Sequence, residues 1–413
     1  MGTTVTVLHS LTIAELDGLD YAIIGSGGFS RRLLALVRAA GVRPPRLVVA
    51  TQAMQDTEVD GIPLCPLDAP EVAALQHLVL GSDVHQPQLL AAASGRVAAG
   101  CRFYDLSDAV QCDLFDLAPW PAGEAGSAPF VLLLAVGHSA PLRRWLHGFA
   151  GWLARLGVTL VCRHPQAAIS DDQLKAACSV IAWNGVTDHF FAIRQRLQQL
   201  AIAVTYAECG FFPQHRHFYF DRSGVNHGSQ LMTDPLDWVG PAELSALAER
   251  RQQLFSGLEV SDGGYCLVPL QIASDSNVQR YSSFTGGMQQ YIDFVEAQPI
   301  DLPLWFKPHP KDLYARSYRC RRGQLVEGDT LSLLAGASMV RGINSSVLLE
   351  AALLGKPVVA DGQGWLNHPG GDQQRLLAAM IARQFSVDER NFDSSRLARF
   401  SHISSCLHQR GLL

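Results

Sequence analysis

Residues 305–361 constrain the fold of this chain most, because they place polar residues on two consecutive strand-to-helix turns. The first apolar run ends at Lys307 and His309, which lie among prolines. The second ends at Ser345 and Ser346, leads into an apolar helix, and returns through a glycine turn to another strand. This alternation predicts a parallel α/β sheet, whose ligands bind at the carboxyl ends of the strands.

The residue types on these turns suit a nucleotide mono- or diphosphate. Ser345 and Ser346 would present hydroxyls and unpaired backbone N–H groups at the positive end of a helix dipole. His309 would add a donor to the same phosphate, and Glu327, just before another helix, is placed to accept from ribose hydroxyls. Alone, Ser345 could be only a helix cap and His309 only a surface turn residue. Their order and spacing favour the binding site.

The run Lys307-Pro308-His309-Pro310, then Glu327, then Ser345-Ser346 resembles the His-Pro, Glu and Ser-Ser elements of glycosyltransferases that use CMP-activated sugars on two Rossmann-like domains, the GT-B arrangement. It looks most like the bacterial capsule polysaccharide biosynthesis family, which includes retaining β-Kdo transferases (Kdo is 3-deoxy-D-manno-octulosonic acid). The resemblance implies that the His and Ser residues bind the CMP phosphate and that the Glu contacts the ribose. The whole expected donor-binding set is His309, Lys307, Glu327, Asn344, Ser345, Ser346 and Gln271.

Two upstream segments extend the resemblance. Residues 268–271, followed by Asp275, look like the family's Val-Pro-x-Gln segment and its Asp. Residues 180–185 and 208–211 are similar to a Trp-Gly element and a Glu-Asp-Gly-Phe element, but Cys209 stands where capsule enzymes commonly carry Asp. The resemblance covers about residues 175–365.

Glu208 and Asp275 are the expected catalytic carboxylates. Glu208 follows an expected strand over 202–206, and Asp275 follows one over 266–271, so the two would meet from opposite lobes at the anomeric carbon. Retention of configuration implies a glycosyl-enzyme adduct. We expect Asp275 to carry the adduct and Glu208 to act as the base or as an alternative attacking group, although the two roles could be exchanged. As structural alternatives, Asp275 could be a turn or cap residue and Glu208 could form an ion pair.

Lys307 and Arg280 are candidates for binding the carboxylate of the donor sugar. We expect no cofactor and no metal, with CMP-Kdo as the donor substrate. The cluster His215-Arg216-His217 has no carboxylate or further His at a familiar ligand spacing, and transferases of this fold need no metal to hold the phosphates.

The predicted fold class is α/β and GT-B-like, with two Rossmann-like lobes facing across a cleft and an extra N-terminal Rossmann-like segment. The predicted boundaries are 1–116 for the N-terminal lobe, 130–255 for the rest of the acceptor-side lobe, 256–395 for the nucleotide-sugar lobe and 396–413 for a tail, with a linker at 117–129. The glycine-rich turn at 25–28 lacks the last Gly of a dinucleotide fingerprint, because Ser30 stands there. It predicts a tight βα turn.

Composition limits the partners. The net charge is −5, which gives no basic field for nucleic acid. Nine scattered cysteines, no signal peptide and no membrane-length apolar run predict a cytoplasmic protein. We also consider peripheral association with polysaccharide-assembly enzymes at the inner face of the cytoplasmic membrane.

The expected reaction is transfer of Kdo to a glycan or lipid-linked glycan of a capsule or of a lipopolysaccharide O-antigen. Two alternatives remain open: a transferase or epimerase that uses another nucleotide sugar on the same fold, and a non-catalytic module of a polysaccharide assembly complex. The Cys at position 209 supports the second alternative, whereas the intact His-Pro, Glu and Ser-Ser elements oppose it.

Overall fold

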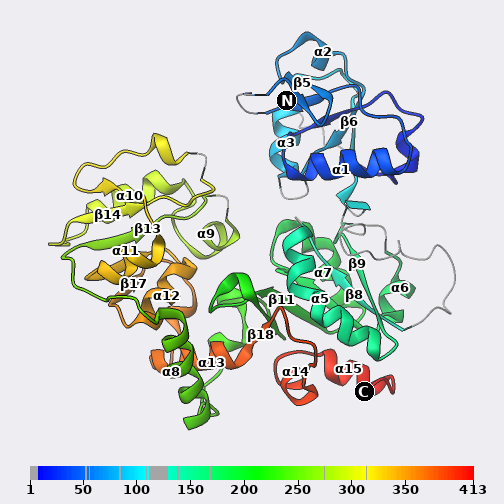
Figure 1. The fold of residues 1–413 in the computed structure, drawn as a ribbon. Coiled ribbons are helices and arrows are strands. Elements are labelled where there is room, and N and C mark those ends of the chain that lie inside the picture. Colours follow the sequence, from blue (N-terminus) through cyan, green and yellow to red (C-terminus); the bar gives the residue numbers. More distant parts are fainter. Residues whose placement is uncertain are drawn as a thin grey trace. The chain divides into compact units, whose positions relative to one another are not determined.

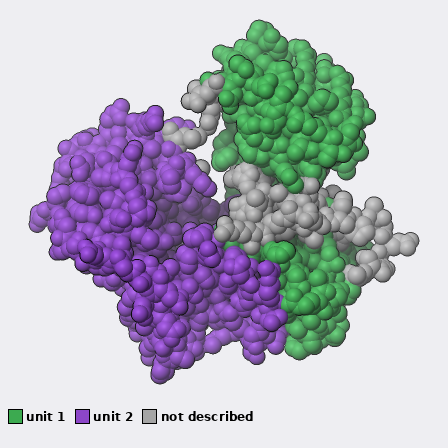
Figure 2. Space-filling view, viewed as in Figure 1, with its two compact units in different colours: residues 1–183, 188–204, 405–413 green, residues 184–187, 205–404 purple. Residues whose placement is uncertain are grey.

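The computed structural model describes residues 8–413 except 52–53, 55, 83–84, 108, 111–128, 137–138, 167–168, 274 and 313. The chain divides into two compact units, which Figure 2 shows in different colours. Unit 1 comprises residues 1–183, 188–204 and 405–413, and unit 2 comprises 184–187 and 205–404. Apart from residue 129, the expected linker at 117–129 lies outside the described residues.

The N-terminal part of unit 1 is a seven-stranded sheet in the order β1-β7-β6-β2-β3-β5-β4 (Figure 1). Its strands are β1 (Leu8–Ser10), β2 (Ala22–Ile24), β3 (Val48–Ala50), β4 (Glu58–Val59), β5 (Ile62–Pro66), β6 (His77–Leu80) and β7 (Arg102–Asp105), and its helices are α1 (Gly28–Ala39), α2 (Pro70–Ala73) and α3 (Gln86–Ala93). All neighbouring strands are parallel except β4, which pairs antiparallel with β5. Alternate residues of β2 enter two separate cores, since Ile23 faces one and Ile24 the other.

The glycine turn after β2 is closed by backbone packing. Gly25 has a φ of +104°, a conformation that favours glycine. The buried hydroxyl of Ser30 donates to the carbonyl oxygens of Gly25 at 2.6 Å and Gly81 at 3.1 Å. A Cβ at Gly81 would lie 2.2 Å from that hydroxyl, so the turn is as tight as expected, and Ser30 completes it.

The rest of unit 1 is built on three parallel strands. They are β8 (Phe130–Leu134), β9 (Thr159–Arg163) and β10 (Ser179–Trp183), connected with α5 (Ser139–Arg155), α6 (Asp171–Ala176) and α7 (Phe191–Gln199). Helix α5 buries Leu146, Phe149 and Leu153, the apolar stripe that its spacing predicts. Helix α15 (Ile403–Gln409) ends the chain.

Unit 2 contains two groups of strands. The antiparallel group is β11 (Val204–Cys209), β12 (His217–Asp221) and β18 (Gln384–Ser386). The parallel sheet has the order β15-β14-β13-β16-β17, with β13 (Cys266–Pro269), β14 (Leu304–Lys307), β15 (Gln324–Leu325), β16 (Met339–Gly342) and β17 (Val358–Ala360). The helices are α8 (Pro241–Phe255), α9 (Ser276–Tyr281), α10 (Met288–Glu296), α11 (Thr330–Gly336), α12 (Ser346–Leu354), α13 (Gln373–Arg383) and α14 (Ser394–Phe400).

Helices cover both faces of the parallel sheet. Val268 of β13 packs in a core with α10, whereas its neighbour Leu267 packs with α11 and α12. Helix α12 also enters a third core through Leu349 and Leu353, which pack with Tyr219 of β12 and with α13. This apolar helix therefore joins the parallel sheet to the antiparallel strands, as its lack of a polar face requires.

The structure confirms the α/β class, with Rossmann-like sheets and an additional one at the N-terminus. One element differs from expectation. Strand β11 extends to Cys209 instead of ending at Tyr206, so Glu208 lies within the strand, because it pairs with Tyr219 of β12. Within the described ranges, no helix is long and apolar enough to cross a membrane.

A buried ion pair fixes the end of β12 to α13. Arg383 donates to Asp221 at 2.5 Å, and both side chains are at most 1% exposed. Asp221 also accepts from the backbone N–H groups of Ser223, Gly224 and Gln230 and from the Ser229 hydroxyl. The carboxylate thereby organises the whole loop that follows β12.

Replacing Arg383 with Met should lower the free energy of unfolding by about 3–5 kcal/mol, because it leaves the buried Asp221 carboxylate without its cation. Arg196→Met is the matched control, since Arg196 pairs with Asp171 at 2.6 Å on the surface. That control should cost at most about 1 kcal/mol. Urea unfolding measures both, and equal losses would contradict this role for the pair.

Candidate functional site

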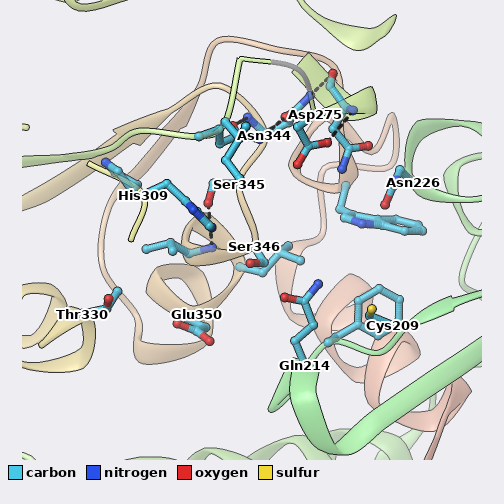
Figure 3. A pocket seen from close by; sticks show the side chains of 18 of the residues that line it. Cys209, Gln214, Asn226, Asp275, His309, Thr330, Asn344, Ser345, Ser346 and Glu350 are labelled. Carbon is cyan, nitrogen blue, oxygen red and sulfur yellow. Dashed lines mark hydrogen bonds between the residues drawn. The ribbon is translucent and has the colours of Figure 1, made fainter. Parts of the chain in front are cut away.

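Unit 2 contains a cavity of about 830 Å³ with walls from both of its strand groups (Figure 3). The parallel sheet contributes the carboxyl ends of β13, β14 and β16, which is where open α/β sheets bind ligands. The lining residues of the cavity include Asn184, Glu208, Cys209, Gln214, Tyr219, Asn226, Gln271, Asp275, Lys307, His309, Thr330, Asn344, Ser345, Ser346, Glu350 and Trp365.

Two predicted site residues, Glu327 and Arg280, are not among the lining residues. Glu327 is exposed and precedes Asp329, the N-cap of α11. Arg280 is exposed in the last turn of α9. The cavity brings together the other predicted residues: Asp275, Glu208, His309, Lys307, Asn344, Ser345, Ser346 and Gln271.

Helix α12 begins at the cavity. Ser345 is its N-cap, and its hydroxyl accepts from the backbone N–H of Val347 at 3.2 Å. Ser346 is the first helical residue and also lines the cavity. The N–H groups of a first helical turn have no acceptors within the helix, so this end presents donors and a positive dipole to an anion. Ser345 therefore caps the helix and forms part of the wall.

Gln271 and Asn344 hold the loop in front of α12. Gln271 donates from Nε2 to Asn344 Oδ1 at 3.1 Å and accepts from the backbone N–H of Asn344 at 3.2 Å. The Asn344 Nδ2 donates to the carbonyl oxygens of Asn277 and Gln363. The polar groups of these two side chains thus position the turn that carries the serines.

His309 follows β14 and presents a neutral donor. Its Nδ1 accepts from the backbone N–H of Lys311 at 3.1 Å, which assigns the proton of the neutral ring to Nε2. Burial, reinforced by the charge of Lys311, lowers the pKa of His309. The ring can therefore donate to a phosphate oxygen at neutral pH without adding a positive charge.

Asp275 is the N-cap of α9 as well as a wall of the cavity. Its carboxylate accepts from the backbone N–H of Asn277 at 2.8 Å. Burial raises the pKa of Asp275, while the Asn277 N–H and the nearby His309 oppose that shift. The capping role considered from the sequence is present, and it also fixes the direction of the carboxylate.

Glu208 is held by two donors. Asn184 Nδ2 donates to Oε2 at 2.7 Å, and the backbone N–H of Cys209 donates to Oε1 at 2.9 Å. Burial raises the pKa of Glu208, the two donors lower it, and the charge of Asp275 raises it further. The two carboxyls are therefore close enough to influence each other electrostatically.

Cys209 cannot supply a carboxylate at its position. Burial, with the adjacent charge of Glu208, raises the pKa of the Cys209 thiol, so it stays protonated at neutral pH. Glu208 is thus the carboxyl that this strand contributes to the cavity.

Sequence reasoning missed several lining residues. Glu350 lies four residues after Ser346 and hence on the same face of α12, a spacing that could have revealed it. Burial raises the pKa of Glu350. Asn184 and Asn226 both have left-handed backbones, with φ of 61° and 53°, and carry no comparable sequence signal. Among the residues that the structure describes, no group of three His, Cys, Asp or Glu side chains could hold a metal ion.

Two solved structures resemble this chain loosely. The β-Kdo 2,7 transferase part of KpsC from Thermosulfurimonas dismutans gives a TM-score of 0.43 at 15% identity, covering 63% of this chain and 96% of that one. The β-Kdo 2,4 transferase part gives 0.44 at 16% identity, covering 62% and 91%.

Protein FixF of Sinorhizobium fredii (strain NBRC 101917 / NGR234) is 32% identical over 206 residues, which are 45% of this chain and 50% of that protein. The chain thus spans about half the length of this curated relative. The family model described as capsule polysaccharide biosynthesis protein matches residues 198–405, which hold every lining residue named above except Asn184. The resemblance predicted from the sequence is confirmed at this level: the chain belongs to the capsule polysaccharide biosynthesis protein family.

Proposed function

We propose that the protein is a glycosyltransferase that moves Kdo from CMP-β-Kdo to a growing bacterial surface polysaccharide with retention of configuration. One observation carries this proposal: a single cavity holds an anion-binding helix end and two partly buried carboxyls, Asp275 and Glu208. A nucleotide sugar needs both parts, because its phosphate must be bound as a leaving group while its anomeric carbon is attacked. Kdo as the transferred sugar rests on the sequence resemblance to the β-Kdo transferases.

The donor phosphate would bind at the start of α12. The hydroxyls and N–H groups of Ser345 and Ser346 would meet it, with Nε2–H of His309 and the ammonium of Lys307 beside them. These donors are fixed before the reaction, and they stabilise the charge that grows on the phosphate as CMP leaves. Neither a metal nor another cofactor is part of the proposal.

The reaction would take two steps. In the first, a carboxylate oxygen of Asp275 bonds to the anomeric carbon, and the bond from that carbon to the phosphate oxygen breaks with its electron pair leaving on CMP. In the second, Glu208 takes the proton of an acceptor hydroxyl, whose oxygen bonds to the anomeric carbon and releases Asp275. Two displacements on the same carbon give overall retention.

The acceptor would be a glycan or lipid-linked glycan of a capsule or O-antigen, used at the inner face of the cytoplasmic membrane. Peripheral association with other assembly enzymes there belongs to the same proposal.

Thermal shift tests the nucleotide. CMP should raise the unfolding midpoint more than UMP or GDP at equal concentration, because the nucleotide with the lowest Kd stabilises the folded state most. A ligand at a hundred times its Kd stabilises the folded state by about 2.7 kcal/mol. Ser346→Ala should reduce the CMP shift, whereas Ser394→Ala, at the first residue of α14 and outside the cavity, should leave it unchanged. A larger shift with UMP or GDP would indicate that the donor sugar is linked to that nucleotide instead of CMP.

Intact-protein mass spectrometry tests the adduct. After incubation with CMP-Kdo, the wild type should gain the mass of one Kdo residue, and Asp275→Asn should not. Asn caps a helix as well as Asp does, so this variant keeps its fold. Asp393→Asn at the N-cap of α14 is the matched control and should still form the adduct. An adduct that forms in Asp275→Asn but not in Glu208→Gln would show that Glu208 carries the adduct and that the two roles are exchanged.

Activity should depend on pH through these carboxyls. Because burial raises the pKa of Glu208 above its usual 4.5, the carboxyl stays protonated to a higher pH than an exposed one. Transfer to the acceptor, the step in which Glu208 acts as the base, should therefore fall on the acid side well before pH 4.5 is reached from above. A kcat/KM profile for the acceptor between pH 4 and 9 measures this, and a flat profile down to pH 4.5 would argue against a buried carboxylate as the base.

A further inference from the structure

Asn226 occupies an unusual position on the loop after β12. It lines the cavity, and its φ of 53° lies in the left-handed region. Figure 3 labels Asn226 on the wall of the cavity that Asp275 and Cys209, the neighbour of Glu208, also line. Residues that are held in this region cluster at functional sites.

The loop fixes this backbone through groups that are themselves buried. The N–H of Asn226 donates to the hydroxyl of Tyr219 at 3.3 Å, and Tyr219 pairs with Glu208 across β11 and β12. The buried Asp221 accepts from Ser223 and Gly224 at the start of the same loop. Asn226 is therefore positioned from the same strand pair as Glu208.

The side chain of Asn226 has no such structural partner. Its carboxamide makes no hydrogen bond to any residue that the structure describes, although the main-chain N–H does. Asn tolerates the left-handed region better than most residues do, and Gly tolerates it better still. A purely structural role would therefore be served at least as well by Gly, so the carboxamide needs another explanation.

We propose that Asn226 is a substrate-binding residue whose carboxamide hydrogen-bonds hydroxyl or carboxylate oxygens of a sugar held between Asp275 and Glu208. This inference rests on the proposed glycosyl transfer and adds a recognition group to it. A carboxamide offers two donors and one acceptor, so it can bind sugar hydroxyls in either direction. It is also neutral, which suits an acidic sugar in a cavity that is already lined by carboxyls, where a further negative charge would repel the sugar.

The test compares Asn226→Gly, Asn226→Asp and the control Ala201→Gly. Ala201 is also left-handed, with a φ of 55°, follows α7 and is not among the residues that line the cavity. Both Gly variants should keep a midpoint within about 4 °C of the wild type, since the relief of backbone strain offsets the added freedom of the unfolded chain. CMP should shift both by the wild-type amount, because CMP lacks the transferred sugar that Asn226 would bind.

Two rates give the functional readout: CMP release from CMP-Kdo without acceptor, and transfer to an acceptor glycan. Asn226→Gly should lose about tenfold to a hundredfold in kcat/KM, the loss expected for a hydrogen bond to a polar or charged sugar group. The kcat/KM of Asn226→Asp should be lower than that of Asn226→Gly if the partner is the sugar carboxylate. Loss in both rates identifies the donor sugar as the partner, and loss in transfer alone identifies the acceptor sugar. Ala201→Gly should match the wild type.

Full activity of Asn226→Gly in both rates would overturn this inference but not the proposed function. It would mean that Asn226 serves only the left-handed backbone conformation of the loop. A lowered midpoint with a lost CMP shift would also overturn it, in favour of a structural role. Absence of CMP release by the wild type would overturn the proposed function and this inference with it.

Discussion

The buried pair between Asp221 and Arg383 determines how one wall of the cavity is built. Asp221 ends β12, Arg383 ends α13, and the carboxylate also accepts from the N–H groups of the loop after β12. A carboxylate buried this completely is tolerated only when it is paired and accepts hydrogen bonds, as Asp221 does. The pair and its donors therefore specify a single course for the loop that presents Asn226 to the cavity.

Helix α12 connects this wall to the opposite one. Its N-terminus faces the cavity, while Leu349 and Leu353 pack in a core with Tyr219 and α13, and Leu348 packs beneath the parallel sheet. An apolar helix shared between two cores is held along most of its surface. The N-terminus of α12 is thus held in a fixed position relative to Glu208, and such prior positioning is what the proposed stabilisation of the donor phosphate requires.

Burial disfavours the ionised forms of the two catalytic candidates, Asp275 and Glu208. Burial raises the pKa of both Asp275 and Glu208, and each carboxyl has backbone or amide donors that partly offset this burial. Raised pKa values of paired carboxyls in a cavity are characteristic of reacting groups, although ion networks produce them too. Here the donors orient the carboxyls but do not neutralise them, which fits groups that must react with a substrate.

Local sequence signals were sufficient to identify the strand-to-helix turns. Apolar runs ending at Lys307 and at Asn344, and capping residues such as Ser345 and Asp275, act within a few residues of their position, so these elements and most of the named residues that line the cavity could be identified from the sequence. The extent of β11 could not, because its end depends on pairing with a second strand.

The sequence by itself therefore determined the α/β class, the family and the order of the site elements. Only the tertiary structure decided which side chains reach the cavity: Glu350, Asn184 and Asn226 do, whereas Glu327 and Arg280 do not. The reason is physical. The direction of a side chain depends on which face of its helix, strand or loop is buried, and that is set by packing between segments far apart in the chain.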